Sequence, residues 1–511
     1  MHEKLFNLMA RRAIIIPTSE IYNPVGGFYD YGPVGLLIKR KIIEEWRNIF
    51  IKEDGFLEID GRTLLPEIAL KASGHIDHFN DPLVECTKCH KRYRADHLLE
   101  EKKIDAQHMS YDEMSKAIRE NNITCPVCQS ELSNVKPFNM MFKTYVGAVE
   151  GESNAIYLRP ETAQNIFMNF QKIFNTHGAK LPMGIGQVGH SYRNEIAPRQ
   201  GLIRQREFEQ MELEYFFDPA EDDSAYLDAV KDVIVPLQTR EQQRKKENFD
   251  LVSLGDAYKN GDIPVKTLAY FIAKEQKLLN ALGIMNFRVR HLMEDETPHY
   301  SGGNFDVEIP TKFGWIEVIS LAYRTNYDLA RHKEFSGKNL EVTYNDKKVL
   351  AHVIEPSIGL DRLFWCALEN AYVEDKERGW DWLNLPPSIA PYDAYILPLM
   401  KKDNMPEKAK EIYKQLIYAF DVYYDVSGSV GRRYAKADEI GVPYCITVDY
   451  QTFEDDTVTV RFRNDAKQVR LPLDILSSEL RRFKLNGIVE ASKSGLPVIT
   501  EQPKKNKLTK D

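Results

Sequence analysis

The sequence predicts an α+β protein followed by a smaller C-terminal α/β domain, and three observations lead to this fold class. The stretch RNEIAPRQGLIRQREFEQMELE, residues 193–214, indicates two strands around a loop. Residues 35–54 carry apolar side chains at helical spacing. Beyond a Pro-containing linker at 383–391, strands and helices alternate, which is typical of an α/β domain with a partly parallel sheet.

Length and composition indicate a folded chain with several cores. The 511 residues are 43% hydrophobic, enough for roughly two to four domains. No apolar run approaches the roughly 18 residues of a membrane-spanning helix, and the N-terminal apolar stretch is too short for a secretory signal, so we expect a cytoplasmic protein without a membrane partner. The net charge of −8 argues against a protein that coats nucleic acid indiscriminately, but it is compatible with a local basic surface that binds one RNA.

The first predicted element is the long amphipathic helix at 35–54, for which Gly55 is the expected C-cap. A strand follows it and ends at Pro66. A second strand, IYLR, leads into a helix that begins at Pro160, because proline is favourable in the first turn of a helix. Five apolar residues supply the buried stripe of this helix: Ile166, Phe167, Phe170, Ile173 and Phe174.

Between these two strands we expect a cysteine-bearing insertion at about 84–136. Four cysteines form two Cys-x-x-Cys pairs there, a spacing typical of tetrahedral zinc coordination: Cys86, Cys89, Cys125 and Cys128. The segment between the pairs is about twice the usual zinc-ribbon loop, so one pair could hold the metal without the other. A thiol-rich exposed insert and redox chemistry are the alternatives. The other two cysteines, Cys366 and Cys445, lie in apolar contexts and are expected to be buried.

The second half of the α+β part begins with residues 219–285, which are polar and are interpreted as a helical insertion. Three strands follow, at FDVEIP, FGWIEVISLAY and VLAHVIEP, and then a helix, GLDRLFWCALEN. The α+β part thus spans 1–388 and the α/β domain 389–485. Residues 486–511, which end in EQPKKNKLTKD, are expected to be a disordered tail.

The strand periodicity of 193–214 places chosen side chains on one face. Alternate residues of an extended chain share a face, so Arg193 and Glu195 point together, as do Phe208 and Glu212. The last two are separated by about 14 Å, at roughly 3.4 Å per residue, the length of a nucleotide with a small acyl group. The alternative is a charged hairpin whose arginines pair with its own glutamates, although such surface pairs contribute only about 0–1 kcal/mol each.

The blocks YRNE and REFEQMELE, followed by EPSIGLDR, resemble motifs 2 and 3 of the class II aminoacyl-tRNA synthetases. The blocks TSEIYNPVGGFYDYGPVG, LRPETAQ and GRRYAKADEIGVPYCITVD further resemble the dimeric glycyl-tRNA synthetases, over nearly all of residues 1–485. The resemblance implies a class II catalytic domain, an antiparallel sheet with flanking helices, and a C-terminal anticodon-binding domain. It also implies a homodimer whose interface is built by the helix at 35–54 and the strand that ends at Pro66, with an ordinary core helix as the alternative.

The resemblance implies ATP, glycine and tRNA(Gly) as partners, with a magnesium ion that accompanies ATP. Arg193 is expected to hold the α-phosphate, Glu195 the adenine amino group, and Phe208 the face of adenine. Arg362 is expected on the other face of the nucleotide and at its terminal phosphate. Arg204 would contact the γ-phosphate or the acceptor end of the tRNA, with Arg206 as the alternative.

Glycine's ammonium group is expected to bind three residues: Glu161, Glu212 and Ser357. For Glu161 the alternative is a favourable charge at a helix N-terminus. Glu317 and Glu355 are candidate magnesium ligands, and each could instead be a hydrogen-bonded structural carboxylate.

The implied reaction needs no side-chain nucleophile. Glycine's carboxylate attacks the α-phosphate of ATP, pyrophosphate leaves in line, and the glycyl-adenylate then acylates the terminal ribose of the tRNA. Arg193, Arg362 and Mg²⁺ supply positioning and electrostatic stabilisation, with Glu195 holding the base. A pocket without room for a β-carbon excludes larger amino acids by clash, so we expect no editing domain.

In the C-terminal domain the resemblance assigns anticodon recognition to GRRYAKADEIG and VTVRFRND. Arg432, Arg433 and Lys436 are therefore expected to contact tRNA, with a solvated surface position as the alternative for each.

The chain departs from the family pattern at Ser320 and Tyr323, which follow GWIE, and at Phe462, where the family carries an acid. Two alternatives to the glycine enzyme are a catalytically inactive binding subunit on the same scaffold and a class II synthetase for proline, threonine or serine. The retained charged motif residues argue against the first, and the acidic ammonium-binding residues argue against the second.

Overall fold

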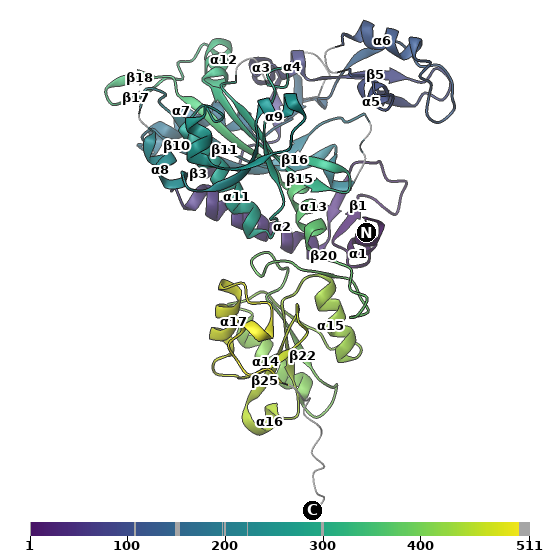
Figure 1. Cartoon of the computed structure of the whole chain (residues 1–511), viewed down its shortest axis with the longest axis vertical. Coiled ribbons are helices and arrows are strands. Elements are labelled where there is room, and N and C mark those ends of the chain that lie inside the picture. The colour runs from purple at the N-terminus through teal and green to yellow at the C-terminus, as the bar shows by residue number, and fades with distance from the viewer. Residues whose placement is uncertain are drawn as a thin grey trace, which may run out of the picture.

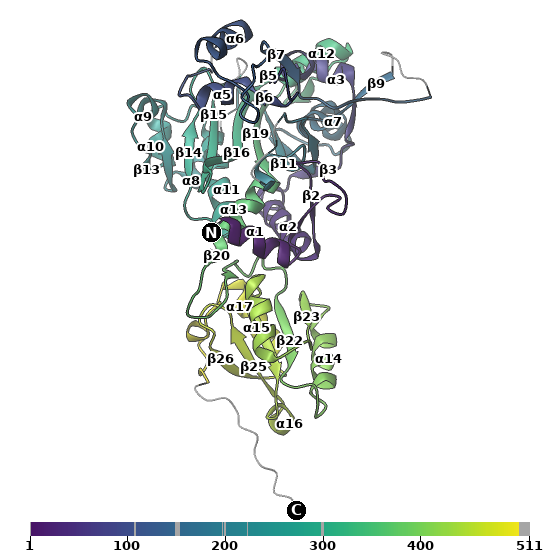
Figure 2. The ribbon, with the colours of Figure 1, turned by 90° about the vertical axis from the view of Figure 1, so that its right-hand side faces the viewer.

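The computed structural model describes residues 2–499 apart from 107–108, 149–153, 197, 199–200, 222 and 298–300. The chain forms a larger N-terminal body and a smaller C-terminal body that lie end to end (Figure 1). The first helix, α1 (His2–Arg11), lies beside the junction between them (Figure 2). Within the described ranges, no helix combines the length and the apolar character needed to cross a bilayer.

A nine-stranded sheet forms the centre of the larger body, in the order β13-β12-β14-β15-β16-β19-β11-β10-β3. All neighbouring pairs are antiparallel except β12 with β14 and β10 with β3. This confirms the predicted α+β class and its antiparallel sheet. The strands are β3 (Leu57–Ile59), β10 (Met183–Tyr192), β11 (Glu207–Phe217), β12 (Ile234–Gln238), β13 (Asp250–Ser253), β14 (Arg288–His291), β15 (Asn304–Thr311), β16 (Gly314–Thr325) and β19 (His352–Gly359).

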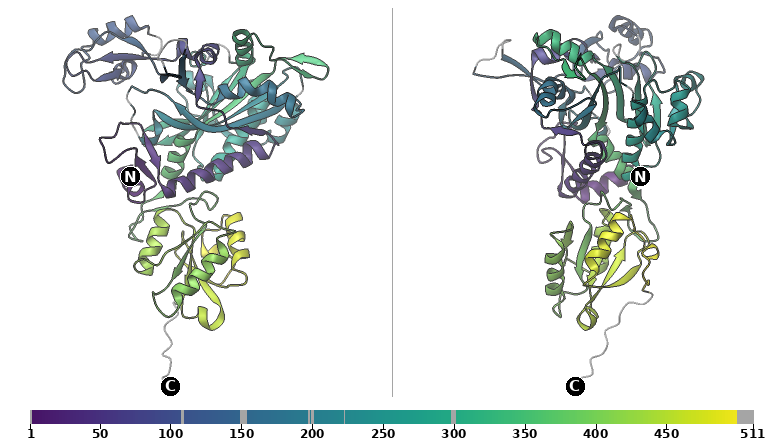
Figure 3. Two further views of the ribbon diagram at one scale, coloured as in Figure 1. Left: turned by 180° about the vertical axis from the view of Figure 1, so that it is seen from behind. Right: turned by 90° about the vertical axis from the view of Figure 1, so that its left-hand side faces the viewer.

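The two faces of the sheet bury different helices, as the alternation along β11 shows. Met211, Leu213 and Tyr215 are buried in one core, with side chains from α2, α11 and α13. Phe216 faces the other side and stacks on Phe170 of α7, with 3.9 Å between ring centroids. Seen from behind, α2 runs along the sheet (Figure 3, left). The helices are α2 (Pro33–Trp46), α7 (Ala163–Thr176), α11 (Lys266–Ala281), α12 (Tyr327–Ser336) and α13 (Leu360–Ala371).

The helix predicted at 35–54 is present, and it continues past Trp46 as a π-helical turn, Arg47–Lys52. The helix predicted from Pro160 begins at Ala163 instead, because Thr162 takes the N-cap position. Four of its five expected stripe residues are buried, and Ile173 is partly buried.

The interpretation of 219–285 as a helical insertion is wrong in part. β12 and β13 lie in this range and extend the main sheet at its edge. α11, in the same range, is buried in the main core through residues such as Leu268 and Phe271. The high average polarity of the segment hid a helix whose buried face is mostly apolar and two short strands, of which β13 is the edge of the sheet.

The cysteine-bearing insertion lies at the end of the larger body farthest from the C-terminal body (Figures 1 and 2). It has a core of its own, which includes Cys86, Cys125 and Leu99. Its three-stranded sheet has the order β6-β5-β7. Its elements are β5 (Asn80–Glu85), β6 (Arg92–Arg94), α5 (Ala95–Glu100), α6 (Tyr111–Glu120) and β7 (Lys136–Asn139).

The C-terminal body has a five-stranded sheet in the order β23-β22-β24-β25-β26, with β22 parallel to both of its neighbours. The partly parallel sheet agrees with the α/β prediction. Its elements are β22 (Ala394–Pro398), α14 (Met405–Leu416), β23 (Val422–Tyr424), α15 (Val430–Glu439), β24 (Tyr444–Val448), β25 (Thr457–Phe462), β26 (Gln468–Pro472) and α17 (Leu476–Leu485).

The tail expected from residue 486 starts later than predicted. Ala491 is fully buried in the C-terminal core, and Val498 pairs with Val469 of β26. Residues 486–499 therefore belong to the C-terminal body, and 500–511 lie outside the described residues. The polar composition of the segment concealed these two anchoring residues.

Ion pairs around α15 join the two bodies. Glu439 accepts hydrogen bonds from Arg11, the last residue of α1, at 2.9 Å, and from Arg12, which follows the helix. The adjacent Asp438 binds Arg378 from the larger body at 3.2 Å and Arg461 of β25 at 2.8 Å. α15 is thus fastened on both sides.

Candidate active site

The register of the central strands places polar residues from distant parts of the chain in one row. Gln187 of β10 is opposite Glu212 of β11, which is opposite Ser357 of β19, which is opposite Ser320 of β16. This row lies on the same face of the sheet as Phe216 of β11. Near Phe216, α7 covers that face. The uncovered part of this face is the floor of a cavity.

This cavity has a volume of about 280 Å³ and contains every residue that the motifs assigned to ATP, glycine or magnesium. Arg206 is not among its lining residues; its guanidinium donates to the Gly26 carbonyl at 2.6 Å. The roles of the lining residues stay predictions. They are Glu161, Arg193, Glu195, Arg204, Phe208, Glu212, Glu317, Glu355, Ser357 and Arg362.

Arg193 and Phe208 form a stacked pair at one end of the cavity. The guanidinium carbon lies 5.2 Å from the centroid of Phe208 and 5.3 Å from that of Phe79, so the cation lies between two aromatic rings. Nε donates to the Pro160 carbonyl at 3.3 Å. Burial, and then the nearby charge of Arg362, lower the pKa of Arg193, so the group is poised to gain from an anionic ligand.

Glu317 and Arg362 meet at the cavity wall through a local irregularity. Glu317 and Ser320 are three residues apart and would face opposite sides of a regular strand. A bulge at Val318, where the pairing with β15 shifts, returns Glu317 to the cavity side. Arg362 donates to the Glu317 carbonyl at 3.0 Å and to the Ile203 carbonyl at 3.1 Å.

Glu195 also lines the cavity, and its Oε2 lies 3.8 Å from Nε of Arg204. One of its oxygens, Oε2, is buried without a hydrogen-bond partner among the described residues. A buried acceptor of this kind is costly unless a ligand donates to it, which suits the predicted contact with an amino group.

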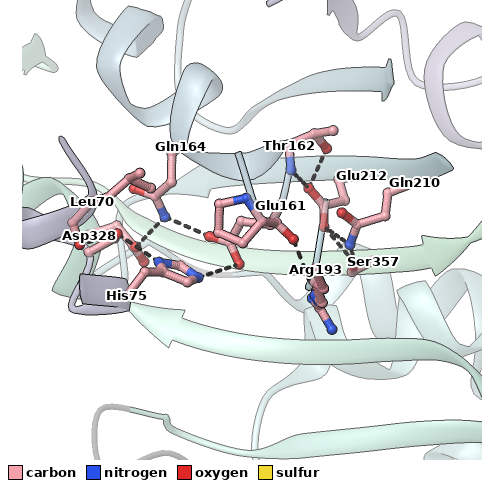
Figure 4. Close-up of polar contacts among 12 residues, drawn as sticks. Leu70, His75, Glu161, Thr162, Gln164, Arg193, Gln210, Glu212, Asp328 and Ser357 are labelled. Carbon is pink, nitrogen blue, oxygen red and sulfur yellow. Dashed lines mark hydrogen bonds and ion pairs between the residues drawn. The ribbon is translucent and has the colours of Figure 1, made fainter. Parts of the chain in front are cut away.

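Glu212 is held by four hydrogen bonds. Oε1 accepts from Gln210 at 2.8 Å and from Ser357 at 2.7 Å. Oε2 accepts from the backbone N–H of Thr162 at 2.9 Å and from its hydroxyl (Figure 4). These contacts fill the acceptor positions of a carboxylate, so an incoming ammonium group replaces one of them. Burial and the charge of Glu161 raise the pKa of Glu212.

Glu161 is less completely bonded. Oε1 accepts from Gln164 at 2.7 Å, and Oε2 lies 3.4 Å from Nε2 of His75 (Figure 4). Burial raises the pKa of Glu161, but His75, Arg324 and Gln164 outweigh burial and hold it below the ordinary range. An ionised carboxylate with acceptor capacity left is what an ammonium ligand requires.

The floor of the cavity contains a group of acids that the sequence did not predict to lie together. Oxygens of Glu212, Glu214 and Glu355 all lie within 4.8 Å of one another. Arg324 balances this charge: it donates to Glu355 at 2.7 Å and to Asp328 at 2.7 and 2.9 Å. Arg324 ends the run VISLAYR, where an arginine directly after a mostly apolar strand was the available signal.

The two candidate magnesium ligands occupy different parts of the cavity. Glu355 belongs to the floor and is paired with Arg324, whereas Glu317 is half exposed and lies 3.5 Å from Arg362. Glu355 is fully buried, and burial raises its pKa to about 8 in spite of Arg324. Glu317 therefore fits a metal that arrives with a phosphate, and Glu355 fits it poorly.

The three expected tRNA contacts on α15 differ in their exposure. Arg432 is exposed, and Lys436 is half-buried and donates to Ser427 at 2.8 Å. Arg433 is 1% exposed and donates to backbone carbonyls, at 2.7 Å for Pro398 and 3.1 Å for Asp425. The assignment of Arg433 to RNA binding is therefore wrong, because its guanidinium is already used inside the domain.

The three departures from the family pattern have different surroundings. Ser320 lines the cavity opposite Ser357. Tyr323 does not line it, and its hydroxyl lies 2.7 Å from Nδ1 of His352. Phe462 is fully buried in the C-terminal core, with its ring 5.0 Å from that of Phe483. Only Ser320 therefore touches the candidate site.

Comparisons with known proteins agree with this arrangement. The model of the tRNA synthetase class II core domain (G, H, P, S and T) matches residues 145–244, and that of an anticodon-binding domain matches 393–483. The solved prolyl-tRNA synthetase of Giardia lamblia in complex with prolyl-adenylate has the same fold: the TM-score is 0.58 at 16% identity, over 95% of this chain and 80% of that one. The fold and the cavity define a class II aminoacyl-tRNA synthetase.

Similar sequences come from archaea. The glycine–tRNA ligase of Methanocaldococcus jannaschii is 41% identical, over 94% of this chain and 98% of its own. Those of Pyrococcus furiosus and Methanothrix thermoacetophila are 40% and 38% identical, over 94% and 97% of this chain and 99% of each relative. The chain belongs to the glycine–tRNA ligase family, which confirms the resemblance carried by its motifs.

Proposed function

We propose that this chain attaches glycine to tRNA(Gly) in two steps, through a glycyl-adenylate. The observation that carries the proposal is the polarity of one cavity: arginines and an aromatic ring line one end, and buried carboxylates form the other. About 14 Å of β11 joins Phe208 to Glu212. Membership of the glycine–tRNA ligase family supports the choice of amino acid.

At the nucleotide end, Phe208 and Arg362 enclose adenine, and Glu195 accepts from its amino group. Arg193 moves from its position between the rings of Phe79 and Phe208 to contact the α-phosphate. Arg204 contacts the terminal phosphate of ATP or the acceptor end of the tRNA. A bound Mg²⁺ neutralises phosphate charge, and Glu317 would hold it. The arginines stabilise the charge that develops in line with the leaving pyrophosphate.

At the amino-acid end, Glu161 accepts the ammonium group, and Glu212 and Ser357 complete the contact. Charge-assisted hydrogen bonds of about 1.5–3 kcal/mol each give affinity to a ligand without a side chain. The floor is crowded by Glu212, Glu214 and Glu355, whose oxygens lie within 4.8 Å of one another. A floor this crowded leaves little room for the β-carbon of a larger amino acid, which supports selection of glycine by size.

At the level of the whole chain, we assign catalysis to 1–388 and anticodon recognition to the C-terminal body. Arg432 and Lys436 on α15 are its proposed contacts to the anticodon arm. We further propose a homodimer that acts in the cytoplasm, with α2 and the segment 57–66 at the interface, because the first strand of that segment, β3, is an edge strand of the main sheet. Sedimentation equilibrium measures the oligomeric state directly, and a monomer at micromolar concentration contradicts this part.

A structural zinc ion is proposed for the insertion. Sγ of Cys86 lies 3.4 Å from that of Cys128, and Sγ of Cys89 lies 3.6 Å from that of Cys125. Tetrahedral zinc with bonds of about 2.3 Å separates its sulfurs by roughly 3.8 Å, so the four thiols fit one ion. Backbone N–H groups of Lys88 and Cys89 point at the Cys86 sulfur, each at 3.4 Å. These thiols would close the coordination shell, so the ion is structural.

Metal analysis tests the zinc proposal without an activity assay. Protein purified without chelator is expected to contain about one zinc per chain, and Cys125→Ser to lose it. Removal of the metal is expected to unfold the insertion at a lower temperature than the catalytic domain. A zinc content near zero contradicts the proposal.

The central test is amino-acid-dependent exchange of pyrophosphate into ATP, measured with each of the twenty amino acids. Exchange is expected with glycine and to be much weaker with alanine, serine, threonine and proline. The absence of exchange with glycine, or stronger exchange with another amino acid, overturns the proposed function.

A further inference from the structure

His75 contacts Glu161 from outside the cavity. Its Nε2 lies 3.4 Å from Oε2 of Glu161, and 15% and 14% of the two side chains are exposed. His75 does not line the cavity, whereas Glu161 does. Figure 4 shows the imidazole between Glu161 and the end of α3 (Glu67–Ala72). The histidine therefore acts on a pocket residue and not on a ligand in the pocket.

Ser73 holds the other nitrogen of the ring. Its Oγ lies 2.8 Å from Nδ1 of His75 and 3.2 Å from the carbonyl oxygen of Leu70. A hydroxyl donates one hydrogen and accepts others. It can donate to Nδ1 of a neutral ring, or it can donate to Leu70 and accept from Nδ1–H of a charged ring. In both states Nε2 keeps the hydrogen that faces Glu161.

The groups around this pair come from several elements. Gln164 of α7 donates to the other oxygen of Glu161 and lies 3.4 Å from Asp328 of α12. Asp328 is paired with Arg324 of β16. The ring of His75 also packs edge-on against Phe79, at 5.5 Å between centroids. Glu161 is thus fixed from two sides, by the amide of Gln164 and by the imidazole of His75.

We infer that His75, oriented by Ser73, is a positioning residue that holds the carboxylate of Glu161 in place and in its charged form for the amino group of the substrate. The inference rests on the proposed function, because it takes Glu161 as an ammonium-binding residue. An acid that rotates away or takes up a proton loses a charge-assisted bond to the substrate. The nearby His75 charge is also the largest influence that lowers the pKa of Glu161 against burial.

The experiment is the pH profile of kcat/KM for glycine in pyrophosphate exchange at saturating ATP. In His75→Ala, the KM for glycine at neutral pH is expected to rise about tenfold or more, while the KM for ATP changes less than about twofold. The acid limb of the profile is expected to move to higher pH, because Glu161 loses the charge that kept it ionised.

A second variant, His75→Gln, separates orientation from charge. The side-chain amide that it introduces does not titrate but still donates a hydrogen, so the KM for glycine above pH 8 is expected to stay near that of the wild type. Its acid limb is still expected to shift to higher pH. His78→Gln is the matched control: His78 is exposed on the same short helix, α4 (His75–His78), and its profile is expected to match the wild type.

The outcomes distinguish the two proposals. If the wild-type enzyme shows no glycine-dependent exchange, the proposed function itself is wrong. If the wild type exchanges, equal increases of KM for glycine and ATP in His75→Ala, with the acid limb in place, overturn the role of His75. If His75→Ala does not fold, Ser73→Ala takes its place: a shifted acid limb supports the inference, and unchanged profiles in both Ser73→Ala and His75→Gln overturn it.

Discussion

A single carboxylate, Glu212, shows how the chain prepares a charged group for a ligand. Its four donors come from β11, β19 and the N-cap of α7. They fix the rotamer before any ligand binds, so little side-chain entropy is lost on binding. Because burial raises its pKa, the same donors also keep the carboxylate accessible as an anion.

Replacing this charge without changing its shape gives the first prediction. Glu212→Gln is expected to raise the KM for glycine about tenfold or more and the KM for ATP less than about twofold, since a charge-assisted bond is worth about 1.5–3 kcal/mol. Pyrophosphate exchange with varied glycine and varied ATP measures both constants. Glu207→Gln, on the same strand but outside the cavity, is the control. Equal increases of both constants contradict the role.

A second buried acid gives a prediction about stability. Glu275 of α11 is fully buried, and among the described residues neither of its carboxylate oxygens has a hydrogen-bond partner. Burial, and then the charge of Asp306, raise its pKa well above the ordinary value of 4.5. The folded chain therefore binds a proton that the unfolded chain releases above about pH 4.5, and stability falls as pH rises through the folded pKa.

Glu275→Gln removes this titration and keeps the shape. Melting temperatures measured between pH 5 and pH 9 are expected to converge at pH 5 and to diverge at high pH, with the variant the more stable. Parallel curves across this range would show that Glu275 does not titrate in the folded chain.

At the residue scale, the sequence predicted the motif side chains but not the residues that hold them. Arg193, Glu212 and Arg362 stand in blocks whose spacing is informative. Thr162 and Arg324 act through contacts across the sheet, and nothing in their local pattern specifies a partner far away in the chain. Periodicity describes one strand at a time, whereas the register between strands decides which side chains meet.

Among the elements, α15 separates two functions on one helix. Arg432 is exposed, whereas Arg433 is buried and bonded to carbonyls of Pro398 and Asp425. Successive residues of a helix differ by about 100° in direction, so adjacent arginines reach different surroundings. A basic pair in a sequence does not show which member is inward.

This separation predicts opposite effects for two neighbouring substitutions. Arg432→Ala is expected to weaken tRNA binding, to reduce the slope of log K against log salt by about 1, and to leave the melting temperature unchanged. Arg433→Met is expected to destabilise the C-terminal body by about 3 kcal/mol or more, since each buried carbonyl left without a donor costs about 1–3 kcal/mol. Filter binding at several salt concentrations and thermal unfolding measure the two effects. A salt slope changed by Arg433→Met in folded protein contradicts the assignment.

Element prediction succeeded where an apolar pattern was continuous. The helix at 35–54 and the strand at 394–398 follow from local periodicity. Of the two strands predicted within 193–214, β11 is present, but its partner β10 ends at Tyr192, so Arg193 and Glu195 lie in the loop and not on a strand. β13 was missed because an edge strand exposes polar side chains and resembles the loops around it. β12 was missed because it has only five residues and contains Pro236, which argues against a strand inside a sheet.

On the scale of the whole molecule, charged contacts link the C-terminal body to the first helix of the chain. Arg11 of α1 and the following Arg12 bind Glu439, whose side chain is only 10% exposed. α1 itself is anchored in the main core through Leu5, Leu8 and Met9. The helix thus links the core of one body to the surface of the other.

Loss of the contact between Glu439 and the two arginines is expected to reduce aminoacylation of tRNA but not the activation of glycine. In Glu439→Gln, aminoacylation kcat/KM for tRNA is expected to fall several-fold, while tRNA-independent pyrophosphate exchange stays within about twofold of the wild type, because the cavity is untouched. Glu374→Gln is the control, since Glu374 binds Lys4 of the same helix but belongs to the larger body. An equal fall in exchange would show that α1 supports the active site instead.

The pairing of α1 with α15 also constrains the order in which the molecule is completed during synthesis. Arg11 and Glu439 are 428 positions apart, so at about 5–20 residues per second the first helix waits roughly 20–90 s for its last partner to leave the ribosome. The ring of Phe6, which lies 4.8 Å from that of Trp365, waits nearly as long. The segment that is synthesised first is therefore among the last to reach its final contacts. Until then, the incomplete chain exposes the apolar face of α1.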